Sequence, residues 1–155
     1  MNEAERITDQ LRRSIDGDAW HGPSVFEALK GINSSQAASR PLKNAHTVWE
    51  ILLHITVWVE QVHKRLRGND HRKELPPEQD WPPQPGRPDE AAWTALQDSL
   101  RKGHRELSDS LARLDDTRLE QPIQEGFSTA YVTLHGLIQH NLYHAGQIAI
   151  LKKAF

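Results

Sequence analysis

The chain has 155 residues and a formal net charge of −2, with 19 basic and 21 acidic side chains. This length fits a single domain over residues 1–155, and the balanced charge argues against the basic surface of a nucleic-acid-binding protein. There is no cysteine, which excludes disulfides, thiolate metal sites and a cysteine nucleophile.

Hydrophobic residues are spread along the whole chain. No segment approaches 18 consecutive apolar residues, and the first six residues are mostly polar. We therefore expect neither a membrane-spanning helix nor a signal peptide, no membrane partner, and a cytoplasmic location.

The apolar residues of the first half recur with the helical period of about 3.6, and strand signals are nearly absent. The pattern predicts a first helix over residues 3–14 and a shorter helical piece that ends at Leu29. A turn follows, in which Ser34 or Ser35 can cap a short helical turn. The second long helix is expected over residues 45–66.

Residues 69–88 differ from the rest in composition, because they hold six of the nine prolines. Proline interrupts helices and is excluded from central strands, so this segment is predicted to be a non-helical crossover. Trp81 supplies a side chain to bury, which favours an ordered connection. A connection of this length frees the next long helix from lying antiparallel beside the second.

The second half of the chain is again helical in pattern. A third long helix is expected from an N-cap at Asp89 to Leu114. An irregular connection that can hold a short turn follows over residues 115–132, and then a fourth long helix over residues 133–153. Four long helices with apolar stripes predict an all-α four-helix bundle with a long proline-rich crossover between the second and third helices.

Two histidines, His140 and His144, lie on the apolar face of the fourth helix, together with Leu137 and Ile148. Side chains four residues apart on a helix have β-carbons about 5–6 Å apart, close enough for two imidazoles to bind one metal ion. The alternative is that each buried ring hydrogen-bonds to a neighbouring side chain or to water.

A catalytic zinc site usually has three protein ligands, so a third donor is needed. His54 is the best candidate, because it lies in the middle of the second long helix at the edge of its apolar stripe. Five other histidines are expected to be solvated: His46, His63, His71, His104 and His135.

Two polar residues lie one helical turn from these histidines. Glu50 precedes His54 and can orient a ring or act as a base, and the alternative is an ordinary polar residue at the edge of the stripe. Gln147 lies close to the direction of His140 on the wheel and has the same two interpretations.

With these residues in place, the sequence resembles the DinB-like (damage-inducible) family of metal-dependent bacterial proteins. The resemblance covers nearly the whole chain, and its closing block is the most specific part. It rests on Trp20–Ser24, His46–Glu50 followed by His54 and Ile55, Trp81, and His140–Ile148.

The resemblance implies a four-helix bundle in which His54, His140 and His144 bind one divalent metal ion, zinc or nickel. It also implies a homodimer. Better-characterised members of the family use low-molecular-weight bacterial thiols such as bacillithiol or mycothiol, so such a thiol is the expected cosubstrate.

The leading hypothesis is a metal-dependent enzyme, with a thiol-dependent S-transferase acting on a small-molecule substrate as the preferred activity. Glu50 would serve as base or ring orienter, and His21 would reach the mouth of the pocket unless it is only a surface turn residue. Two alternatives remain: a non-catalytic metal or small-ligand binding protein, such as a stress-linked sensor or carrier, and a purely structural interaction module.

Overall fold

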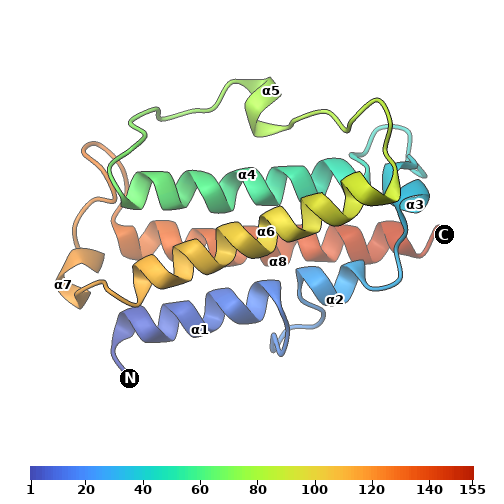
Figure 1. Ribbon diagram of the computed structural model, residues 1–155. Helices are drawn as coiled ribbons and strands as arrows, with labels where there is room; N and C mark the ends of the chain where they lie inside the picture. Colours follow the sequence, from blue (N-terminus) through green and yellow to red (C-terminus); the bar gives the residue numbers. More distant parts are fainter.

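The structure, a computed structural model, describes residues 1–155 and is all-helical, as predicted (Figure 1). It has no strand, only an isolated bridge between Pro122 and Thr129. None of the helices combines the length and apolar character needed to cross a lipid bilayer. There are eight helices: α1 (Glu3–Ile15), α2 (Val25–Leu29), α3 (Ser34–Ala38), α4 (Val48–Leu66), α5 (Pro77–Asp80), α6 (Glu90–Leu111), α7 (Asp116–Leu119) and α8 (Ala130–Lys152).

The four long helices pack along one another. Helix α4 contacts both α6 and α8, and α1 contacts the same two helices (Figure 1). The Trp49 and Trp93 rings meet at 5.0 Å near the start of α4 and α6, and His63 meets Ser110 near their ends, so the two helices run in the same direction. The long and short helices together enclose one core of 30 buried hydrophobic residues.

The proline-rich segment leaves the end of α4 and enters the start of α6, returning past α4 on the way (Figure 1). The expectation that it holds no helix was wrong, because α5 forms one helical turn. Pro77 occupies the first position of that turn, where a missing N–H breaks no helical hydrogen bond. The Trp81 side chain that follows is half-buried and packs against the core.

Capping residues explain why two helices begin at residues other than the predicted ones. Helix α4 begins at Val48 because the Thr47 side chain accepts from the Glu50 N–H, while the Glu50 carboxylate accepts from the Thr47 N–H. Helix α8 begins at Ala130, earlier than expected, because the Thr129 hydroxyl caps it.

Two further details differ from the prediction, namely the cap of α3 and the end of α6, whereas α7 agrees with the short turn allowed after the third long helix. Asn33 caps α3, not Ser34 or Ser35, since its side-chain oxygen accepts from the Gln36 N–H at 2.9 Å. The connection over residues 115–132 contains the short helix α7. Helix α6 starts after the Asp89 cap as predicted but ends at Leu111.

Candidate metal centre

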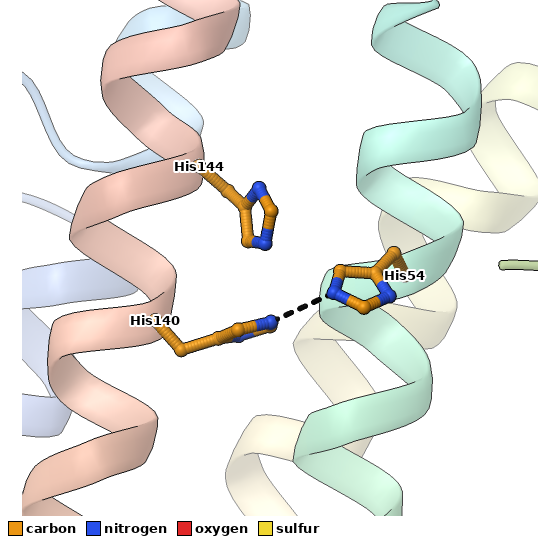
Figure 2. Close-up of side chains that lie close together, drawn as sticks. All are labelled: His54, His140 and His144. Atoms are coloured by element: carbon orange, nitrogen blue, oxygen red, sulfur yellow. Dashed lines mark hydrogen bonds between the residues drawn. The ribbon is translucent and has the colours of Figure 1, made fainter. Parts of the chain in front are cut away.

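Three histidines converge between α4 and α8 (Figure 2). His54 comes from α4, and His140 and His144 stand one turn apart on α8. Their potential ligand nitrogens all lie within 4.8 Å of one another, and the Nε2 atoms of His54 and His140 are 3.0 Å apart. The structure therefore brings together the three residues that the sequence singled out.

Helix packing places these rings inside the molecule. His54 and His144 lie on the faces along which α4 and α8 touch, and only 5% and 4% of their surface is exposed. His140 is half-buried. Three polar rings are thus withdrawn from water, a cost that requires partners for their nitrogens.

Hydrogen bonds fix the tautomer of two of the rings. His54 Nδ1 lies 2.6 Å from the carbonyl oxygen of Asp80, and His144 Nδ1 lies 2.6 Å from Oε1 of Gln147. Both oxygens only accept, so both Nδ1 atoms carry the proton and donate it. Each Nε2 is left with a free lone pair, which is the usual arrangement of metal-ligating histidines.

The third ring lacks such a partner. His140 Nδ1 is buried without a hydrogen bond. Its Nε2 faces the Nε2 of His54, which accepts because the proton of that ring is on Nδ1. Two nitrogens bound to one ion at 2.0–2.1 Å lie about 3 Å apart, so the observed separation suits a shared metal ion.

Burial keeps all three imidazoles neutral. It lowers the pKa of His140 to about 3, with a further contribution from the neighbouring rings of His144 and His54. Burial also lowers the pKa of His144 to about 4 and moves that of His54 in the same direction, against the opposing effect of the Asp80 carbonyl. Neutral imidazole is the form that binds metals, so the site is ready to bind at neutral pH.

Trp81 from the proline-rich segment covers one side of the centre. Its ring stacks on His54 and on His46, in each case with centroids 3.7 Å apart and planes within 5°. Two rings cannot occupy the same space above one face, so the imidazoles lie on opposite faces of the indole. The segment therefore fixes the orientation of a ligand ring.

Asp80 was not identified from the sequence, although it contributes twice. Its carbonyl oxygen holds His54, and its carboxylate accepts a hydrogen bond of 2.8 Å from Trp58 Nε1. A contact made by a backbone carbonyl cannot be predicted from the type of the residue. Only the position of α5 beside α4 brings Asp80 to the ring.

Glu50 bonds to residues outside the triad. Its carboxylate accepts from Arg40 at 2.7 Å and from the Thr47 N–H, and it lies 3.3 Å from His46 Nδ1. Partial burial tends to raise the pKa of Glu50, but the hydrogen bonds from Arg40 and Thr47 outweigh it and lower the pKa. The residue orients His46, whose ring stacks on Trp81.

His21 lies exposed in the turn between α1 and α2. This turn is on the side of the molecule away from α5 (Figure 1). A role for His21 at the mouth of the pocket stays a prediction.

The other histidines occupy varied environments. His46 and His71 are exposed as expected, whereas His63 and His135 are half-buried. The expectation for His104 was wrong, because only 6% of its surface is exposed.

The error at His104 came from its charged sequence neighbours. Its spacing from Leu100 and Leu107, four residues after one and three before the other, places it on the apolar stripe of α6. Helical spacing was the signal that predicts its burial. No second histidine lies with it.

Comparisons with known proteins point to one family. Residues 19–148 match the sequence model of the DinB superfamily. No curated protein matches the chain significantly. Among solved structures, a conserved protein from Enterococcus faecalis has a similar fold, with a TM-score of 0.75 and 15% identity, over 99% of this chain and 97% of that one.

Proposed function

Because this chain belongs to the DinB superfamily and brings three histidines together, we propose that it is a metal-dependent enzyme. The observation that carries the proposal is the arrangement of the ring nitrogens. The Nε2 atoms gather inside the protein, while Asp80 and Gln147 hold the Nδ1 protons of His54 and His144. Histidines that only satisfy one another in a core do not need three ring nitrogens gathered at one point.

The preferred activity is the transfer of a small-molecule group to a low-molecular-weight thiol. A zinc or nickel ion held by the triad would supply Lewis acidity that lowers the pKa of the thiol. The thiol loses its proton to solvent, its sulfur forms the new bond to the electrophilic carbon, and the leaving group departs with its electron pair. The chain has no cysteine to compete for the electrophile.

A cavity of about 390 Å³ next to the centre can admit a small substrate. His46 and Gln147 line it, and both contact residues of the centre. His46 stacks on Trp81, and Gln147 accepts a hydrogen bond from His144. Most of the remaining wall is apolar, including Ile51. A volume in this range with few polar groups is typical of small-molecule sites.

Within this proposal Glu50 is a positioning residue that acts through His46. Its lowered pKa makes it a weak base at neutral pH, which favours ring orientation over proton transfer. We expect Glu50→Gln to raise KM more than it lowers kcat. A loss confined to kcat, with a shifted pH profile, would instead make Glu50 the base.

Metal content tests the proposal directly. The untagged protein, purified without chelator, should hold about one zinc or nickel ion per chain by elemental mass spectrometry. His54→Ala, His140→Ala and His144→Ala should each lose it. His63→Ala on α4 and His135→Ala on α8 are matched controls that should keep it. A wild-type chain that stays empty after reconstitution, or a triad variant that keeps the metal, contradicts the proposal.

Cobalt spectroscopy separates an enzyme from a non-catalytic carrier or sensor. The visible spectrum of the cobalt-substituted protein should change when a thiol or azide is added, because a catalytic site keeps an open coordination position. A spectrum that ignores both additions means a closed site and favours the binding protein.

We further propose that the four long helices form the family's four-helix bundle and that the chain is a homodimer. Val132, Tyr143 and Ile150 are each more than half exposed and share one face of α8. Such a stripe is typical of a subunit contact. Sedimentation should give twice the mass of the 17.7 kDa chain, and Tyr143→Glu should shift it toward the monomer.

A further inference from the structure

A second, smaller cavity lies beside the triad between α4 and α8. Its volume is about 240 Å³, and His140 forms part of its wall. Trp58, Val62 and Leu137 supply apolar surface, and Arg65 supplies the one full charge. The cavity lies below the size of a drug-sized pocket, so it suits a small molecule or one end of a larger one.

Arg65 is unusual among the charged residues of the chain. Only 6% of its surface is exposed, yet no carboxylate forms an ion pair with it. Its Nη2 donates to the carbonyl oxygens of Arg72 and Lys73 at 3.0 and 3.2 Å, while its Nε is buried with no partner. The nearby carboxylate of Asp70 is bound to Arg72 at 2.6 Å.

Aromatic rings compensate only part of this burial. The guanidinium lies over the Trp58 ring at 5.4 Å and over the Phe127 ring at 4.9 Å. A buried cation still requires a hydrogen-bonding anion to offset its lost hydration. The guanidinium of Arg65 thus has no directly bonded carboxylate at the wall of a cavity.

We propose that this cavity binds the carboxylate of a small molecule with an apolar body, and that Arg65 is its anchor. The Nε–H of Arg65 has no partner, and a carboxylate would accept a charge-assisted hydrogen bond from it. The inference rests on the proposed function in one respect, since it makes the cavity a substrate subsite next to His140. The bound anion would place the rest of the molecule beside the metal centre.

Calorimetric titration with phenylacetate and its neutral analogue phenylacetamide tests the carboxylate. Phenylacetate should bind the wild-type protein at least tenfold more tightly than the amide. Arg65→Met should weaken phenylacetate binding by about 10- to 100-fold, the effect of a lost hydrogen bond to a charged group, and should leave the amide unaffected. Equal affinity for the two probes overturns the proposal.

A second variant tests whether the ligand binds in this cavity and leaves Arg65 unchanged. Gly136 lies in the wall of the cavity, and a β-carbon added there meets no atom within 4 Å, so Gly136→Leu fills the space without a backbone clash. Gly146→Leu is the matched control, because Gly146 is equally open and also lies inside α8 but does not line the cavity.

Gly136→Leu should abolish phenylacetate binding, and Gly146→Leu should preserve it. Binding that survives Gly136→Leu overturns the proposal even if Arg65→Met fails to fold. Metal content is measured on the same variants and should be unchanged. Loss of phenylacetate binding with metal retained thus supports the subsite, whereas an absence of metal in every protein contradicts only the proposed metal enzyme.

Discussion

Buried histidines occur in two regions of this molecule, and only one of the regions has the geometry of a site. Between α4 and α8, His54, His140 and His144 face one another, and Asp80 and Gln147 hold the outer nitrogens. On α6, His104 is just as deeply buried but stands alone. Burial alone therefore does not identify a functional histidine.

The partners of His104 show the difference. Its Nδ1 lies 3.8 Å from the Asp16 carboxylate, and its Nε2 is buried with no partner. The adjoining groove between α1 and α6 encloses about 530 Å³, more than the cavity of about 390 Å³ next to the triad, but its walls are almost entirely polar and charged. Convergence of three ring nitrogens, rather than burial or cavity size, distinguishes the triad.

The largest expected effect is stabilisation by zinc. At a zinc concentration about 100 times the Kd, binding adds about 2.7 kcal/mol to the free energy of unfolding, or roughly 5–10 °C in Tm for a domain of this size. His144→Ala should abolish the shift, and His104→Leu should retain it. Thermal unfolding with and without zinc measures both. A shift that depends on His104 would break the comparison.

The Trp81 stack is expected to have the next largest effect. Trp81→Ala should lower the free energy of unfolding by about 1–3 kcal/mol, less than for a fully buried aromatic, and weaken zinc binding about 10- to 100-fold because His54 loses its orientation. Trp20→Ala is the control, since that side chain is fully exposed. Denaturant titration and zinc titration give the two values, and equal effects of both variants would contradict a role for the stack.

His104 should make stability depend on pH. Burial lowers its pKa below the 6.5 of the unfolded chain, with Asp16 opposing and Arg105 and Arg12 adding to the shift. Below pH 6.5 the unfolded state binds a proton that the folded state does not, so stability falls as pH falls, by at most about 1.4 kcal/mol per pH unit. Chemical unfolding of His104→Leu between pH 7 and 5 should show a shallower slope than the wild type; an unchanged slope would exclude His104 as the cause.

The smallest effects are expected at two helical glycines, one in each region. A β-carbon at Gly136 meets nothing within 4 Å, and one at Gly103 makes ordinary contact with Val59 at 3.6 Å. Alanine at either position should raise the free energy of unfolding by about 0.5–1 kcal/mol through helix propensity. Urea midpoints measure the change, and destabilisation at Gly103 alone would mean that α4 and α6 pack too closely there for a methyl group.

Much of this architecture could be predicted from local pattern. The period of the apolar residues identified the long helices, and the four-residue spacing of His140 and His144 identified the pair, because both features follow from the geometry of a single helix. His54 was found in the same way from its place on the stripe of α4. His104 lies on such a stripe too, but its charged neighbours led to the wrong expectation that it is solvated.

Only the tertiary structure decided which groups meet across elements. Asp80 reaches His54 through a backbone carbonyl, and Trp81 reaches it through a segment without helical period, so neither contact has a signature in residue spacing. The unpaired state of Arg65 is also a tertiary property, since it depends on which carboxylates the fold leaves within reach. Short-range periodicity determines elements and their faces, whereas contacts between distant segments depend on how the whole chain packs.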